Sequence, residues 1–181
     1  MLTFLGPADT SFTLSIEGYQ FPEIPEDYDA NWVNVAVRAS VRKQRVHQQS
    51  PCLLSWDVMR LACWFQQIAR QENPESDHFS GLENDLTFDL TGQNKGLFQF
   101  RITLQHGLLP VPTASEPCLE PIVVPVTVRA DELEAAATAL WSDVKRFPSR
   151  GQLGKQWVGI LSQRGCSSPM KGTHSNGNCG E

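Results

Sequence analysis

The sequence lacks any hydrophobic run long enough to cross a bilayer, and it lacks a recognisable export signal. Its apolar runs, such as residues 122–124, fall far below the roughly 20 residues that a membrane-spanning helix needs. The N-terminal segment has no basic flank, and its apolar stretch breaks at Gly6 and Pro7. These absences predict a soluble, cytoplasmic protein without a membrane partner.

Cysteines and histidines are too widely spaced to predict a disulfide framework or a metal site. The five cysteines are an odd number without CxxC spacing, which is typical of reduced thiols. Cys63 falls inside a helical pattern, where a free cysteine usually behaves as a small core residue. Cys166, His174 and Cys179 match no recognised zinc spacing, and a fourth ligand is missing. We therefore predict no metal.

Motifs of catalysis are also missing. The chain has no GxSxG, HExxH or GxGxxG sequence and no Walker lysine. Carboxylate pairs occur at Asp27 with Asp29 and at Glu83 with Asp85, but two carboxylates do acid and base work only where their environments separate their pKa values. We expect no catalytic residue and no cofactor. An enzyme that acts through Glu83 and Asp85 stays as an alternative.

Lysine and arginine are absent from residues 1–37, which carry six acidic residues. Residues 38–70 carry six basic residues against Asp57 alone, and residues 71–94 return to six acidic residues with no Lys or Arg. Strands of opposite charge could pair across a sheet, which stabilises it by roughly 0.2 to 1 kcal/mol per pair. Alternatively, the acidic blocks converge and attract a cationic partner. A pI near 5.4 argues against nucleic acid as that partner.

Alternating apolar and polar residues predict two groups of strands, each followed by a helix. Residues 91–96, TGQNKG, supply the turn of a hairpin, and Pro125 argues for an edge strand or a bulge. Connections this short cannot provide parallel crossovers, so the predicted class is α+β with antiparallel sheets. Three strands and a helix occur twice in the predicted order, with the helices packed on one face. The predicted strands cover residues 12–16, 33–37, 41–48, 86–90, 97–104 and 122–128.

Two amphipathic helices follow these groups of strands. The first is predicted over residues 56–72, with Ser55 as its N-cap. The second begins at Asp131, with Glu134 as its capping-box partner, and residues 147–148 end it. The apolar stripe of each helix is expected in the core.

The length of 181 residues fits one domain. We predict a single α+β domain over residues 1–150 and a C-terminal extension over residues 151–181. Residues 152–163 keep apolar side chains that suit a short helix or strand over the core. From about residue 165 the composition is rich in Gly, Ser, Asn and Lys, so that part is predicted to be disordered.

One loop combines negative charge with aromatic side chains. Residues 18–37 read GYQFPEIPEDYDANWVNVAV, in which a short connection leads into a strand. Asp29 and Asn31 could serve only the turn, Tyr19 and Phe21 could hold the loop down, and for Trp32 a place in the core is favoured. The candidate partner-binding residues are Glu23, Glu26, Asp27, Tyr28 and Asp29.

Several segments resemble the WapI-type family of bacterial immunity proteins. They are LSIEGYQFP at residues 14–22, YDANWV at 28–33, LLS at 53–55, which opens a helix, and RFPSR at 146–150. The segment LENDLTF at 82–88 is similar to a family motif but has Asn84 where that motif has Pro. The resemblance extends over roughly residues 10–150.

This resemblance implies a bacterial protein that binds and neutralises a toxin domain in the producing cell. A toxin nuclease carries a basic cleft for phosphate, and an acidic loop with an aromatic anchor suits such a cleft. The expected partner is therefore a cationic toxin domain, for which a nuclease is one candidate. An interaction or structural module without a toxin partner is the alternative, and the oligomeric state stays open.

Overall fold

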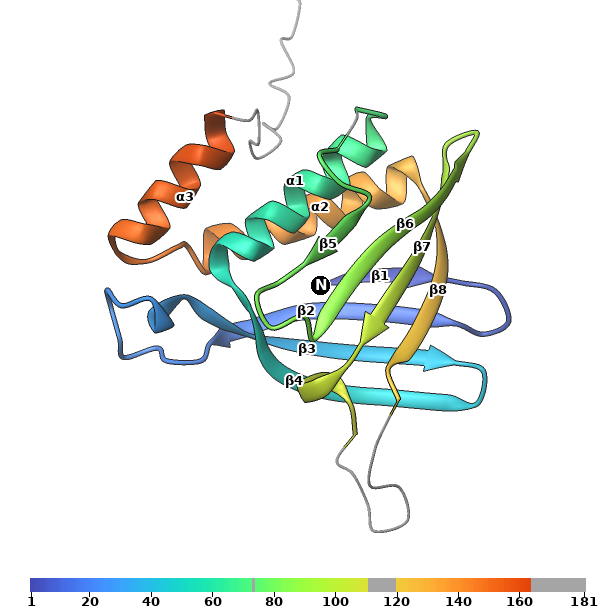
Figure 1. Ribbon diagram of the computed structural model, residues 1–181, viewed down its shortest axis with the longest axis horizontal. Coiled ribbons are helices and arrows are strands. Elements are labelled where there is room, and N and C mark those ends of the chain that lie inside the picture. The colour runs from blue at the N-terminus through green and yellow to red at the C-terminus, as the bar shows by residue number, and fades with distance from the viewer. Residues whose placement is uncertain (73, 111–119, 164–181) are drawn as a thin grey trace, which may run out of the picture.

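The computed structural model describes residues 1–72, 74–110 and 120–163. Within these ranges the chain forms two four-stranded antiparallel sheets and three α-helices (Figure 1), which confirms the predicted α+β class. The first sheet contains β1 (Leu2–Leu5), β2 (Ser11–Tyr19), β3 (Trp32–Val41) and β4 (Gln44–Leu54), in that order. The second contains β5 (His78–Ser80), β6 (Leu86–Asn94), β7 (Leu97–Leu104) and β8 (Ile122–Arg129). The helices are α1 (Ser55–Ala69), α2 (Ala130–Arg146) and α3 (Gly151–Gln163), and short 3₁₀ turns occur at η1 (Asp29–Asn31) and η2 (His106–Leu108).

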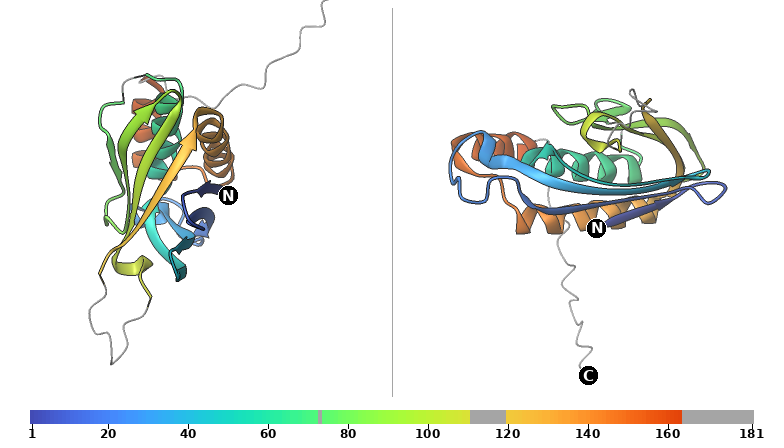
Figure 2. Two further views of the ribbon diagram at one scale, coloured as in Figure 1. Left: turned by 90° about the vertical axis from the view of Figure 1, so that its right-hand side faces the viewer. Right: turned by 90° about the horizontal axis from the view of Figure 1, so that it is seen from below.

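Helix α1 lies between the second sheet and α2, as the left view of Figure 2 shows. Its Phe65 ring makes edge-on contacts with Phe4 of β1, and with Phe88 and Phe100 of the second sheet. Phe12 of β2 also contacts Phe88 directly, with ring centroids 5.7 Å apart. The buried apolar side chains therefore form one cluster that includes both sheets, α1 and α2.

Each group of strands contains four members, whereas three were predicted. The short β1 pairs with β2 and buries Leu2 and Phe4, and β5 pairs with β6 through only three residues. Strands of three or four residues are too short to show a clear alternation of apolar and polar side chains. The predicted strand at 41–48 in fact begins at Gln44 and continues past Pro51 to Leu54. It is an edge strand with a register shift opposite Val33, where proline is tolerated.

Both predicted helices are confirmed, but their capping contacts differ from the predicted ones. Helix α1 begins at Ser55, and Asp57 accepts a hydrogen bond from the Leu54 backbone N–H at 3.1 Å. Helix α1 ends at Ala69, three residues before the predicted end. In α2 the carboxylate of Glu132 accepts the Arg129 backbone N–H at 2.8 Å, so the predicted partner Glu134 was wrong.

The hairpin between β6 and β7 is confirmed, with a tighter turn than predicted. Lys95 and Gly96 both have positive φ angles, 48° and 76°, as a two-residue turn requires. Pro125 lies in β8, which is an edge strand as predicted. Residues 151–163 form a helix whose Leu161 is buried. The domain boundary at residue 150 stays a prediction, and the disorder predicted from about residue 165 lies outside the described residues.

Candidate functional site

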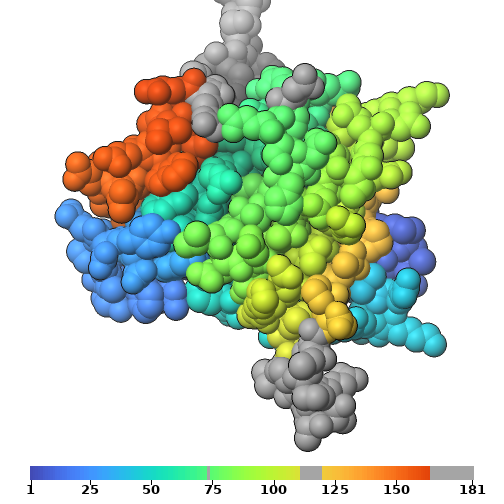
Figure 3. All heavy atoms as spheres, viewed as in Figure 1, coloured from blue at the N-terminus to red at the C-terminus, as the bar shows by residue number. Residues whose placement is uncertain are grey.

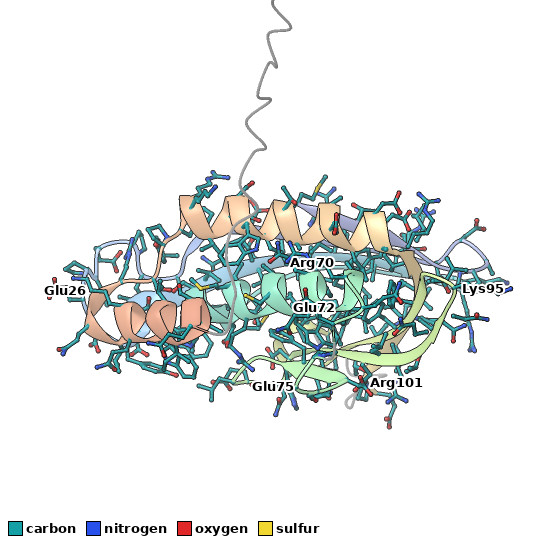
Figure 4. All side chains as sticks on the ribbon, turned by 90° about the horizontal axis from the view of Figure 1, so that it is seen from above. Glu26, Arg70, Glu72, Glu75, Lys95 and Arg101 are labelled. Carbon is teal, nitrogen blue, oxygen red and sulfur yellow. The ribbon has the colours of Figure 1, made fainter. Side chains whose placement is uncertain are left out.

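The acidic loop, defined here as residues 20–29, connects β2 to η1. Figure 4 places Glu26 at one end of the molecule, far from Lys95 at the other. The side chains of all five candidate partner-binding residues are exposed, and 38% of the Tyr28 surface is accessible. Those residues are Glu23, Glu26, Asp27, Tyr28 and Asp29. No ion pair among the described residues joins an acid of residues 1–37 to a base of residues 38–70. Cross-strand ion pairs therefore do not join the first acidic block to the basic one, whereas Asp89 of the second acidic block pairs with Arg101 across β6 and β7.

Arg150 holds the acidic loop in place. Its Nη1 lies within hydrogen-bond distance of three loop carbonyls, those of Phe21, Pro22 and Ile24, at 3.2, 3.3 and 2.8 Å. The guanidinium also lies over the Tyr19 ring, 3.4 Å from its centroid. Arg150 follows α2 in the sequence and is not part of the loop. A single side chain from another segment thus holds the loop backbone in place.

Asn31 is the second residue that holds the acidic loop in place, and its side chain is buried. Its Nδ2 donates to the carbonyls of Asp27, Tyr28 and Arg150 at 3.2, 3.4 and 3.3 Å. Its Oδ1 accepts the Arg150 backbone N–H at 2.7 Å and the Ser55 hydroxyl at 3.0 Å. Asn31 therefore joins the acidic loop, the start of α1 and the segment after α2.

The segments that carry the resemblance meet at this point. Tyr19 donates its hydroxyl hydrogen to the Pro148 carbonyl at 2.5 Å, and its ring meets Phe147 edge-on. The Ser55 hydroxyl also shares a hydrogen bond with the Ser149 hydroxyl, 3.0 Å away. The distinctive residues of GYQFP, YDANW and RFPSR thus serve largely to hold the loop. We call the side chains of Tyr19, Asn31, Ser55 and Arg150 the loop anchor.

Asn31 contacts the turn as predicted, through the Asp27 and Tyr28 carbonyls, but it also bonds Ser55 and Arg150 outside the turn. The core interpretation of Trp32 was wrong. Trp32 is only half buried, and its Nε1–H donates to the Asp29 carboxylate at 3.3 Å. Because Trp32 opens β3 with its side chain on the face opposite the buried Val33, it lies away from the core. Asp27 accepts the Tyr28 backbone N–H at 2.6 Å, so it too contributes to the turn.

A groove runs beside the acidic loop. Figure 3 shows α3 above this loop, with the start of α1 recessed between them. The groove has a volume of about 400 Å³ and is lined by Tyr28, Trp56 and Trp157, together with Asp57, Arg60 and Leu82. Trp56 is buried, and both exposed rings rest on it. Its centroid is 5.6 Å from that of Tyr28 and 6.2 Å from that of Trp157, which stacks nearly parallel to it.

Negative charge surrounds this groove. Partial burial raises the pKa of the Tyr28 hydroxyl, and the nearby carboxylates of Asp57, Asp29 and Glu83 raise it further. Burial also raises the pKa of Asp57, although the Leu54 N–H and the Arg60 guanidinium, 2.7 Å away, oppose this effect. The chain therefore brings Glu83 to the candidate binding residues, although the sequence separates them by more than fifty positions.

Glu83 and Asp85 differ in burial, and the negative charge of Glu83 adds to the rise in the pKa of Asp85. Asp85 is buried, and its Oδ2 accepts the Gly107 backbone N–H at 3.2 Å and lies 3.5 Å from the Ser50 hydroxyl. Burial raises the pKa of Asp85, and its carboxylate joins η2 to β4. Glu83 is exposed beside the groove. These positions favour an anchoring role for Asp85 and a surface role for Glu83.

The remaining features of the described residues are their thiols, their metal-ligating side chains and the hydrophobicity of their helices. Cys52 and Cys63 are buried, and burial raises the pKa of the Cys52 thiol to about 12. Within the described residues, no group of three or more His, Cys, Asp or Glu side chains could hold a metal ion. No helix in the described ranges is long and apolar enough to cross a membrane.

Sequence reasoning missed Trp56 and Trp157 as site residues. The sequence predicts Trp56 only as the first residue of a helix and Trp157 only as one of the apolar side chains of a segment over the core. One signal was available, because Leu153, Trp157 and Ile160 recur at helical spacing in this segment. In the structure these three side chains are exposed.

A family model described as the immunity protein WapI-like family matches residues 3–148, which is most of the chain. No curated protein and no solved structure matches the chain. The matched region contains both sheets, α1 and α2, and it includes Asn31 and Ser55 of the loop anchor. Helix α3 lies beyond it.

Proposed function

The chain belongs to the immunity protein WapI-like family, and on this premise we propose that it neutralises a bacterial toxin domain by binding it. In this proposal the partner is cationic, the contact is made by Glu23, Glu26, Asp27, Tyr28 and Asp29, and the complex forms in the cytoplasm of the producing cell. The protein acts by contact and converts no substrate.

The observation that carries this proposal is the combination of exposed charge and a fixed backbone. Four carboxylates lie on one exposed loop, and Arg150 and Asn31 hold that loop through hydrogen bonds to its carbonyls. A binding loop that is ordered before contact loses less conformational entropy when the complex forms. Such a loop therefore supports tight association better than a mobile acidic tail.

Charge and aromatic surface have separate roles in this contact. Exposed carboxylates at the rim of an interface speed the encounter with a basic partner more than they slow its dissociation. Tyr28 rests on the buried Trp56 ring and presents its exposed side to the partner, which is the usual position of an interface hot spot. A nuclease, whose active site must attract phosphate, is the toxin class that fits this surface best.

The test uses the toxin domain encoded beside this chain. The variant Glu23→Gln, Glu26→Gln, Asp27→Asn, Asp29→Asn removes four charges and keeps the side-chain shapes. We expect its dissociation constant for the toxin to rise at least roughly tenfold, mainly through a slower association rate. Titration calorimetry and stopped-flow mixing measure the two quantities, and survival of cells that express the toxin measures neutralisation.

The matched control removes four exposed carboxylates elsewhere. The variant Asp9→Asn, Glu72→Gln, Asp77→Asn, Glu134→Gln has the same net charge as the loop variant. It should bind the toxin nearly as well as the native chain. Equal losses in the two variants would assign the effect to overall charge and contradict a contact at the loop. Absence of binding by the native chain would instead support the interaction module without a toxin partner.

A further inference from the structure

The groove between the acidic loop and α3 combines aromatic walls with uncompensated carboxylates. Tyr28 and Trp157 both line the groove, with 38% and 37% of their surfaces exposed. Both rings are held by contact with the buried Trp56, so their orientations are set before any ligand arrives. Aromatic faces attract cations through their quadrupoles, most strongly where neighbouring groups exclude water.

The charges around the groove leave a negative balance. Asp57 at the base is paired with Arg60 at 2.7 Å, so these two groups largely neutralise each other. Arg60, which also lines the groove, lies over the Phe79 ring, 5.4 Å from its centroid. Within the described residues, neither Asp29 nor Glu83 forms an ion pair. Each is the chain neighbour of a residue that lines the groove, Asp29 of Tyr28 and Glu83 of Leu82.

We propose that this groove binds the guanidinium of an arginine side chain on the protein partner, between the rings of Tyr28 and Trp157. The inference rests on the proposed function for its partner but concerns a separate contact. Arginine fits better than lysine because its planar, weakly hydrated head stacks on aromatic rings while its N–H groups reach carboxylates in the same plane. Asp29 and Glu83 are the carboxylates that accept those hydrogen bonds.

Helix α3 makes this contact selective, because it contributes the Trp157 ring. The region matched by the family model ends at residue 148, so Trp157 comes from a segment that the family pattern does not include. The acidic loop provides general attraction for a basic partner, and α3 adds a wall that selects a stacking cation. Helix α3 therefore acts as a specificity element of the groove.

The test follows the tryptophan indole N–H signals of the full chain by NMR while a small probe is added. The probes are three capped tripeptides, Gly-X-Gly, in which X is arginine, lysine or citrulline. Citrulline has the shape of arginine without its charge. The arginine peptide should shift the Trp157 signal and leave the signal of buried Trp141, which is bonded to Gln66, in place. The lysine peptide should bind several-fold more weakly and the citrulline peptide not measurably.

Variants then assign the contact to named side chains. Trp157→Ala should weaken binding of the arginine peptide about tenfold, whereas Trp157→Phe should keep most of it. Because Trp157 is absent from both, their binding is followed by the remaining indole and backbone signals. Glu83→Gln should weaken binding several-fold. The matched control is Val158→Ala, which changes the next residue of α3, is equally exposed and does not line the groove. Its affinity should match that of the native chain.

The outcomes separate this inference from the proposed function. Equal shifts with arginine and lysine peptides, or equal affinity in Trp157→Ala and the native chain, would overturn the arginine groove. If the toxin still loses affinity for the loop variant in that case, the proposed function stands alone. If the arginine peptide binds as expected but no toxin binds the native chain, the groove stands and the proposed function fails.

Discussion

Replacing Asn31 by alanine should destabilise the fold by about 3 kcal/mol. The side chain is 1% exposed and takes part in five hydrogen bonds that connect the acidic loop, Ser55 and Arg150. Its two amide hydrogens are shared among three carbonyls, so we count about four effective bonds, each of which contributes roughly 0.5 to 1.5 kcal/mol. Water that reaches the half-exposed carbonyls offsets part of this loss. An expected range of about 2 to 4 kcal/mol follows.

The assays are urea unfolding and thermal unfolding, both followed by far-UV circular dichroism. A change of about 3 kcal/mol corresponds to a drop in Tm of roughly 6 to 12 °C for a chain of this size. The control is Asn94→Ala, which removes an exposed side chain at the end of β6 and should cost less than about 0.5 kcal/mol. A loss in Asn31→Ala that does not exceed the control would refute the view that Asn31 anchors the loop.

Three further predictions follow from single groups. Gly151 has a φ of 68°, and a Cβ at this position would lie 3.0 Å from the Glu26 carbonyl oxygen. Gly151→Ala should therefore lower the urea midpoint of unfolding. The control, Gly96→Ala, has a similar φ of 76° but open space around the new Cβ, so its urea midpoint should fall less. Burial raises the pKa of Asp57, so the folded state holds the proton of this carboxyl more tightly than the unfolded state does. The free energy of unfolding of the native chain, relative to that of Asp57→Asn, should therefore fall as pH rises from about 4 through the raised pKa. The same pH dependence of the unfolding free energy in both proteins would contradict this. Cys52, with a pKa of about 12, should resist iodoacetamide in the folded chain and react in urea, as peptide mass spectrometry can show; fast labelling of the native chain would contradict its burial.

The sequence predicts the longer elements well because their periodicity extends over several turns or strand residues. The stripe of α1, with Leu61 and Phe65, lies in the core as predicted, and the hairpin at Lys95 and Gly96 follows from local turn chemistry. The short strands β1 and β5 were missed because pairing with a neighbouring strand decides them, and local alternation does not show it. The capping partner of α2 was misplaced for a similar reason, since Glu132 and Glu134 both suit the local pattern.

The candidate site could be predicted only in part. The acidic loop is visible in the sequence because Glu23, Glu26, Asp27 and Asp29 are close neighbours along the chain. Its anchoring by Arg150 is not, because that contact joins residues more than a hundred positions apart. The groove is also a long-range feature, since Tyr28, Trp56 and Trp157 come from three separate segments. Periodicity and local turn chemistry contain no information on such contacts.

The central claim, that the acidic loop and the adjoining α3 surface meet the toxin, is tested most directly by hydrogen exchange of the complex. Mass spectrometry of the free and toxin-bound chain measures which backbone amides become protected. Our account predicts new protection in residues 20–29 and in peptides of α3 that contain Trp157, with little change in α2. Protection confined to another surface, such as the outer face of β2, β3 and β4, with residues 20–29 unchanged, would contradict it.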